Sequence, residues 1–348
     1  MKKRKHRRIT EFYIGITIMV LGIIIQIASG QFFSINNLCD LLRSFTVPAM
    51  FAVGIQMVII SGGMDLSGPS IASLSMYATV KLLLHINYEG NVLLAYGIGA
   101  GIGLLLGAVN GILIGKFDFP PMIVTLGTST LFQGIMYGPL QASESTLPRT
   151  MYAHGEQTLL TVTDASSGLR SSLPIAFLFL IFLLAAAFLI MRYTMIGRGI
   201  YALGGDRIGT VRAGFNVFWI QMFIYCFVGM TAGVIGITRA CMMLNCMPSN
   251  LLGMEMTVIA AVVLGGTAIT GGYGTLTGAM LGMLLMTIVE NSLILVGIPT
   301  TWQRVFIGIV IIGGTGISTY KNGGIMKDIA GLRRKLRNVG VGRGGVDI

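Results

Sequence analysis

The chain has 348 residues, of which 54% are hydrophobic and 11% are charged, and its net charge is +11. An ordinary soluble domain has roughly 25% charged residues, so this composition excludes a soluble protein and indicates an integral membrane protein built of helices. Most of the positive charge lies in two tails and one loop rather than on a folded basic surface, and we therefore expect no nucleic acid partner.

Ten apolar segments follow one another along the chain, each close to the ~17 to 25 residues that cross a bilayer as a helix. They cover 12–29, 46–62, 69–86, 92–116, 121–140, 173–191, 217–238, 254–270, 275–296 and 301–320. The sequence thus predicts an all-α integral membrane protein. A single transmembrane domain at 12–320 lies between basic tails at 1–11 and 321–348. We expect this domain to be surrounded by the lipid bilayer.

The basic residues predict the orientation of these segments, because positive charge resists translocation across the membrane. If both ends lie inside, 18 of the 24 lysines and arginines fall on the cytoplasmic side. We therefore predict an N-in and C-in topology. The basic loop 192–216 is then cytoplasmic, and the long loop 141–172 is external, either as a contact for an extracytoplasmic partner or as a simple connector.

Two apolar segments carry a glycine at every fourth position. Such a row places glycines along one helix face, where missing side chains let a neighbouring helix approach closely. Two interpretations of this glycine face are open. It only holds the helices together, or it also lets them slide between inward-open and outward-open states. The predicted packing residues are Gly99, Gly103, Gly107, Gly111, Gly115, Gly274, Gly278 and Gly282.

Polar residues interrupt several predicted spans, where an unpaired polar group is costly. Each of these polar residues allows a functional interpretation and a structural one. Asp65 belongs to a gate or simply caps a helix, Glu290 lines the solute path or makes a structural hydrogen bond, and the hydroxyls bond solute or their own helix. The predicted path or gate residues are Gln56, Ser61, Gly62, Gly63, Asp65, Ser67, Asn110, Thr125, Thr128, Glu290 and Asn291.

The chain lacks the motifs of common catalytic sites. It has no GxxxxGK[ST] phosphate loop, no HExxH motif, no nucleophile elbow and no CxxC pair among its four cysteines. We therefore expect no enzyme activity, no cofactor, no metal site and no ATP binding by this chain itself.

Four blocks of sequence carry a resemblance to a known family. They are IISGGMDLSGPSIASL at 59–74, GAVNGILIGKFDFPPMIVTLGTSTLFQG at 107–134, GRGIYALGGDRIGTVRAGFNV at 197–217 and VVLGGTAITGGYGTLTGAMLG at 262–282. In these blocks the chain resembles permease subunits of bacterial ABC importers of the ribose-type monosaccharide class. The wider group includes branched-chain amino acid permeases.

The resemblance implies the ABC importer permease fold and a place in the bacterial cytoplasmic (inner) membrane. It also implies a second permease subunit in a homodimer or heterodimer, cytoplasmic ATP-binding subunits that hold the ATPase activity, and an extracytoplasmic solute-binding protein. A coupling helix after the sixth span would contact the ATPase. The positions that match it are Gly197, Arg198, Tyr201, Ala202, Gly204, Gly205, Asp206, Arg212 and Gly214.

Three departures bear on these expectations. The family commonly reads SGGIDLSVGS where this chain has SGGMDLSGPS, the coupling run GGDRIGTVRAGF is unusual, and Glu290 lies where the family often has asparagines. The expected function is passage of a small polar solute, a ribose-type sugar, driven by the partner ATPase. The alternatives are the same machinery with a branched-chain amino acid or nucleoside, and an ion-coupled secondary transporter.

Overall fold

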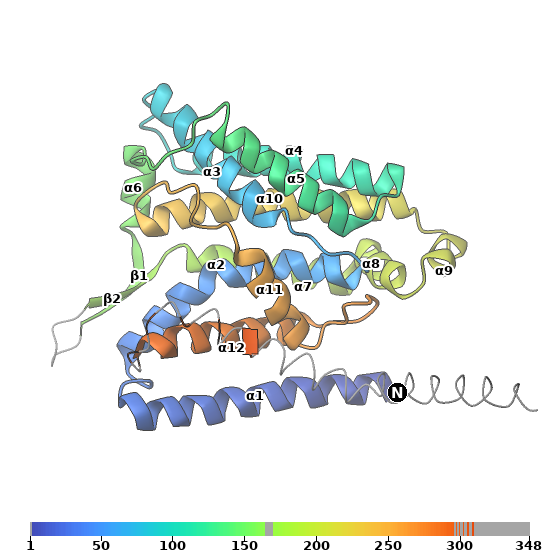
Figure 1. Ribbon diagram of the computed structural model, residues 1–348, viewed down its shortest axis with the longest axis horizontal. Helices are drawn as coiled ribbons and strands as arrows, with labels where there is room; N and C mark the ends of the chain where they lie inside the picture. Colours follow the sequence, from blue (N-terminus) through green and yellow to red (C-terminus); the bar gives the residue numbers. More distant parts are fainter. Residues whose placement is uncertain are drawn as a thin grey trace, which may run out of the picture.

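The computed structural model describes residues 2–163 and 170–295, together with a few single positions up to 309. Helices lie in each of the first nine predicted spans (Figure 1). They are α1 (Lys2–Ser29), α2 (Ile35–Ile60), α3 (Gly68–His85), α4 (Leu93–Phe117), α5 (Pro121–Tyr137), α7 (Phe177–Tyr193), α10 (Val217–Met243), α11 (Met254–Leu264) and α12 (Leu276–Leu295). Most of the predicted span 301–320 and all of the tail 321–348 lie outside the described residues.

The described helices differ in how well they could cross a bilayer. Five are long and apolar enough, or six if α7 and α8 (Met195–Gly205), which are bent by 73°, count as one span. Among the others, α5 has 17 residues and α11 has 11. The structure is thus mostly helical, as expected of a membrane protein, while the number of ten crossings and the orientation stay predictions.

The expectation of an all-α fold is wrong in the loop 141–172, which holds the short helix α6 (Arg149–Gly155) and most of a hairpin. Strand β1 (Thr158–Thr163) pairs antiparallel with β2 (Arg170–Pro174), with Thr161 opposite Ser172. The run TLLTVT is rich in β-branched residues, which favour strands. The hairpin is held to α2 by Ser171, whose hydroxyl donates to Asp40 Oδ2 at 3.0 Å.

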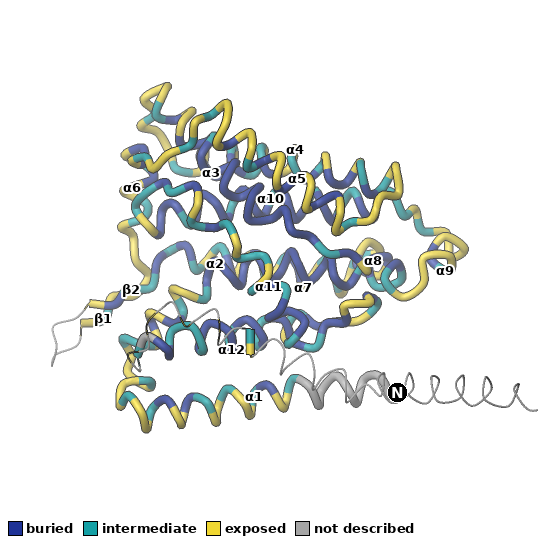
Figure 2. The backbone as a smooth tube through the Cα atoms, in the orientation of Figure 1, coloured by how far each residue is buried: buried dark blue, intermediate teal, exposed yellow. Residues whose placement is uncertain are grey.

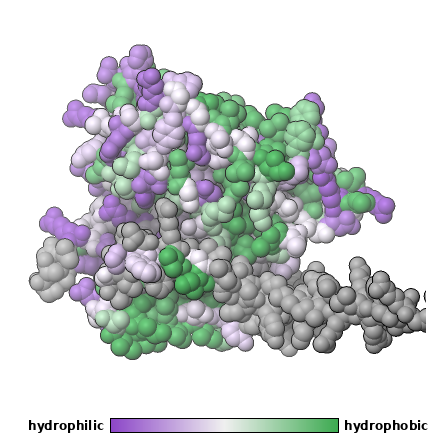
Figure 3. All heavy atoms as spheres, viewed as in Figure 1, coloured by the Kyte–Doolittle hydropathy of each residue, from purple (hydrophilic) through white to green (hydrophobic). Residues whose placement is uncertain are grey.

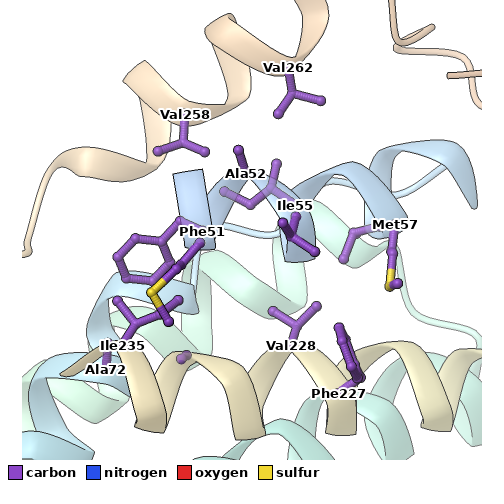
Figure 4. Close-up of a cluster of buried hydrophobic side chains, with 14 of the residues drawn as sticks. Phe51, Ala52, Ile55, Met57, Ala72, Phe227, Val228, Ile235, Val258 and Val262 are labelled. Atoms are coloured by element: carbon purple, nitrogen blue, oxygen red, sulfur yellow. The ribbon is translucent and has the colours of Figure 1, made fainter. Parts of the chain in front are cut away.

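Helix α2 is the centre of the core. From Thr46 to Ile60 every residue is buried, because this stretch is apolar around its whole circumference and other helices cover it on all sides. Phe51, Ala52 and Ile55 lie between Val228 of α10 and Val258 of α11 (Figure 4). In Figure 2 this stretch of α2 has the colour of buried residues, whereas the first residues of the helix include exposed positions.

Large apolar side chains are exposed on the outer helices. Met19 of α1 is 72% exposed, Leu105 of α4 66% and Phe182 of α7 74%. The face in Figure 3 shows an apolar surface between hydrophilic regions at the two ends. Such surfaces are unfavourable in water but suit contact with lipid chains.

The connecting loops gather at two opposite ends of the molecule (Figure 1). The hairpin end holds α6, β1, β2 and the loop 244–253, which is joined to Ser145 by two backbone hydrogen bonds of 3.0 Å at Cys246. The α8 end holds α8, the short helix α9 (Arg207–Arg212) and the loops at 61–67, 118–120 and 265–275. Glu11 near the start of α1 also reaches this end, where it accepts hydrogen bonds from Thr275 at 2.6 Å and Thr277 at 2.8 Å.

Candidate functional site

The loop 61–67 between α2 and α3 places a carboxylate in the protein interior. Asp65 is 1% exposed, and its Oδ1 accepts hydrogen bonds from the Ser67 backbone N–H at 2.7 Å and the Ser67 hydroxyl at 2.6 Å. Gly62 has φ +88°, a conformation that glycine adopts without strain. Irregular backbone in the protein interior requires such internal partners.

Side chains of α4 and α5 complete a polar cluster around this loop. Asn110 donates to the Ser67 hydroxyl at 2.8 Å, and Thr125 Oγ1 accepts from the Leu66 backbone N–H at 3.2 Å. Asn110 is fully buried, and its Oδ1 has no hydrogen-bond partner among the described atoms. Asp65, Ser67, Asn110 and Thr125, all predicted from sequence, therefore come together in one place, which we call the Asp65 cluster.

A second polar group extends the Asp65 cluster along the interface of α3 and α5. The hydroxyls of Ser70 and Ser129 lie 2.7 Å apart, and Gln133 Nε2 donates to Ser70 at 3.0 Å and to Ser129 at 3.3 Å. Ser129 and Gln133 were not among the predicted path residues. Their partner Ser70 on α3 was missed, because a lone serine in an apolar helix gives no signal.

The other predicted path residues do not all join the Asp65 cluster. Thr128 is buried on α5, and its hydroxyl donates to the Thr125 carbonyl of its own helix at 3.3 Å. Gln56 is buried within α2. Glu290 and Asn291 lie on α12, which packs against α1, α2 and α11, whereas the Asp65 cluster is built from α4, α5 and the loop before α3. The structure therefore does not bring Glu290 and Asp65 together.

The segment that matches the coupling region forms two short helices. The Thr194 hydroxyl caps α8 by accepting from the Gly197 N–H at 3.1 Å, and Asp206 Oδ1 caps α9 by accepting from the Ile208 N–H at 3.0 Å. Both are standard N-caps, which explains why the helix restarts twice within one loop. Arg198 and Arg212 are exposed, Ala202 is half-buried, and Gly214 with φ +85° makes the turn into α10.

The α8 end is tied together by contacts between segments far apart in sequence. Arg207 of α9 forms an ion pair with Asp118 in the loop between α4 and α5. The tip of α8 at Gly204 and Gly205 packs against the end of α2 and against Gly272. The glycines at 271 and 272 were not among the predicted functional residues, since a glycine pair in a loop has many ordinary explanations.

The predicted packing glycines of α4 face α10. A Cβ added at Gly103 would overlap the Gly229 carbonyl oxygen, and one at Gly107 would overlap the Tyr225 carbonyl oxygen, while Gly99, Gly111 and Gly115 also face α10 side chains or backbone. In the other row, Gly282 lies against Ala261 of α11, and Gly278 lies against Gly265, the residue that follows α11. Gly274 precedes α12, in the loop beside Thr267.

A comparison with known protein families shows the family to which the chain belongs. A family described as "Branched-chain amino acid transport system / permease component" matches residues 37–314. The chain belongs to this permease family. The resemblance to permease subunits of bacterial ABC importers of the ribose-type class is therefore confirmed, and this permease is a multi-pass protein of the bacterial inner membrane.

Several curated relatives cover nearly the whole permease. The ribose import permease protein RbsC of Escherichia coli strain K12 is 32% identical over 306 residues, which are 85% of this chain and 90% of the relative. RbsC of Bacillus subtilis is 30% identical, with 86% and 89% covered. The autoinducer 2 import system permease protein LsrC of Klebsiella pneumoniae is 29% identical, with 89% and 85% covered. No solved structure matches the permease.

These relatives are named as permease components of transport systems rather than as catalytic subunits. This agrees with the expectation that the permease is not an enzyme. These names also argue against the alternative that the chain is an ion-coupled transporter that works alone. The individual roles of the path, coupling and packing residues stay predictions.

Proposed function

We propose that this permease forms the membrane pathway of an ATP-driven importer for a ribose-type monosaccharide. The ATP would be hydrolysed by separate cytoplasmic subunits, and a solute-binding protein would deliver the sugar from outside to a pair of permease subunits. The names of the relatives support the sugar, since RbsC proteins from three different bacteria cover most of the chain.

The observation that carries the proposal is the position of α8. The helix turns by 73° away from α7, exposes Arg198, and packs its tip against the end of α2 beside the Asp65 loop. An ATPase that binds α8 would therefore act next to the loop that holds the buried polar cluster. This explains how ATP hydrolysis outside the membrane could change the pathway within it.

The Asp65 cluster suits a solute with many hydroxyl groups. Its carboxylate, amide and hydroxyl groups lie in the interior, and the Asn110 Oδ1 atom is available as an acceptor. Such groups can replace the water lost by a sugar as it crosses an apolar region. In the proposed mechanism the cluster offers transient hydrogen bonds to the sugar rather than a tight site.

The strongest alternative keeps this machinery and changes the solute. The relative LsrC is named for autoinducer 2 import, and the family description names branched-chain amino acids. A nucleoside is a further candidate. Because the external binding protein would select the solute, these alternatives share the coupling mechanism and differ only in cargo.

Transport by the purified assembly tests the proposal. The permease is reconstituted in proteoliposomes with its co-purified ATPase and its binding protein, and uptake of radiolabelled ribose, leucine and adenosine is compared. We expect ribose uptake that requires ATP and that excess leucine or adenosine does not reduce. Uptake by the permease alone, driven by a proton or sodium gradient without ATP, would disprove the proposal.

A further inference from the structure

Glycines from three distant segments meet at the tip of α8. An added Cβ at Gly204 would overlap the Ile60 carbonyl oxygen at the end of α2, and one at Gly271 would lie 2.8 Å from Gly62 Cα and 2.9 Å from the Gly204 carbonyl oxygen. We call Gly62, Gly204, Gly271 and Gly272 the glycine junction. Here the backbones touch directly, because no side chain separates them.

Two hydrogen bonds hold the glycine junction together. The Gly272 backbone N–H donates to the Ile60 carbonyl at 2.9 Å, which joins the loop before α12 to the end of α2. The Tyr201 hydroxyl donates to the Gly274 carbonyl at 3.1 Å, which joins α8 to the same loop. Of these two bonds only the second reaches α8 itself, whereas α8 meets the loop 61–67 by packing, since a Cβ added at Gly62 would lie 3.6 Å from Gly204 Cα.

Each attached loop leads directly into a membrane helix. After Gly62, the Met64 carbonyl accepts a hydrogen bond from Thr125 Oγ1 at 3.3 Å. Asp65 and Ser67, which are bonded to each other, follow just before α3, and the Ser67 hydroxyl accepts a hydrogen bond from Asn110 of α4. Beyond Gly272, Thr275 caps α12 by accepting from the Gly278 N–H at 2.9 Å. A shift of α8 would therefore reach α12 by one route and the Asp65 cluster by the other.

We propose that the glycine junction transmits the displacement of α8 to both the Asp65 loop and the start of α12, with Gly204 and Tyr201 as positioning residues. This inference rests on the proposed function, in which an ATPase moves α8. Direct backbone contact suits the task, because no side-chain rotamer is available to absorb the movement and close-packed interiors pass strain on. The specific consequence of this proposal is that the loops 61–67 and 265–275 move together when α8 is displaced.

The chain offers a matched pair of variants to test this role. Gly204→Ala adds a methyl group that meets the Ile60 carbonyl, whereas Gly101→Ala, on α4 and outside the coupling region, has no described atom within 4 Å of the added Cβ. Tyr201→Phe is a milder change that removes only the hydroxyl bonded to Gly274. If Gly204→Ala fails to assemble, Tyr201→Phe and Gly101→Ala still form a valid comparison.

The readout is the movement of the Asp65 loop, so that no solute is needed. The four native cysteines are replaced, Ser61 at the end of α2 is changed to cysteine, and the complex is purified with its ATPase. The maleimide labelling rate at position 61 is then measured without nucleotide and after trapping with ATP and vanadate. ATP hydrolysis is measured in parallel.

We expect trapping to change the labelling rate in the reference complex and in Gly101→Ala. In Gly204→Ala and Tyr201→Phe that change should shrink by about tenfold, within the range typical of coupling between sites, while ATP hydrolysis continues. An unaltered response in both variants would overturn the inference and leave the proposed function intact. If no ATPase co-purifies with the unmodified permease, the proposed function itself fails.

Discussion

At the scale of single residues, the Asp65 loop shows how the interior tolerates polar backbone. The Leu66 N–H is bonded to Thr125 and the Ser67 N–H to Asp65, so neither is left without an acceptor away from water. A buried amide that loses its acceptor pays the full cost of desolvation. The hydroxyl of Thr125 is thus expected to stabilise the loop, in addition to any contact with solute.

Replacing Thr125 with valine tests this expectation. The change preserves shape but removes the acceptor of the buried Leu66 N–H, and we expect it to cost about 1–3 kcal/mol of stability. Thr130→Val is the matched control, because Thr130 is exposed on the same helix and its hydroxyl bonds, among the described residues, only the Leu126 carbonyl. Thermal unfolding in detergent compares the two. Equal melting temperatures would show that the Thr125 bond contributes nothing.

At the scale of helices and strands, the sequence predicted best those features that depend on the residues of a single helix. The glycine row of α4 predicted a close helix contact, but only the structure identifies α10 as the partner, since a repeat defines a face and not its neighbour. Helix α2 begins at Ile35 rather than at residue 46. Asp40 and Arg43 lower the local hydropathy, and their bonds to Ser171 and to the Met242 carbonyl cannot be read from the sequence.

The contact of α4 with α10 gives a second prediction. Gly103→Ala places a methyl group against the Gly229 carbonyl, and we expect overpacking to cost about 1–3 kcal/mol. Gly101→Ala in the same helix has no atom of the described residues within 4 Å of the new Cβ, so it should be neutral or stabilise the helix by up to about 1 kcal/mol. Melting temperatures of the two variants in nanodiscs decide the matter. A similar loss in both would mean that α4 does not pack as described.

At the scale of the whole molecule, the loops that the positive-inside rule assigns to the cytoplasm gather at one end. The ion pair of Arg207 with Asp118 joins two of them, and the contacts of Gly204 with Ile60 and Gly272 join the others. Hydropathy predicts that loops alternate between sides, but not which loops touch. The glycine junction was therefore out of reach of the sequence, although Gly62 and Gly204 were each noticed separately.

Two exposed positions suit an experiment that measures the side of the membrane on which each end of the molecule lies. Ala153 lies on α6 at the hairpin end, and Val211 lies on α9 at the α8 end. Single cysteines are placed at these positions in a background without the native cysteines. Intact spheroplasts are then treated with a membrane-impermeant maleimide, before and after permeabilisation.

We expect Ala153→Cys to react in intact spheroplasts and Val211→Cys only after permeabilisation, because the basic residues around α8 and α9 resist translocation. The four arginines at 192, 198, 207 and 212 make this the most basic loop between the tails. The opposite result would place α8 outside the cell, out of reach of a cytoplasmic ATPase. The coupling role of α8 and the transmission through the glycine junction would then both be wrong.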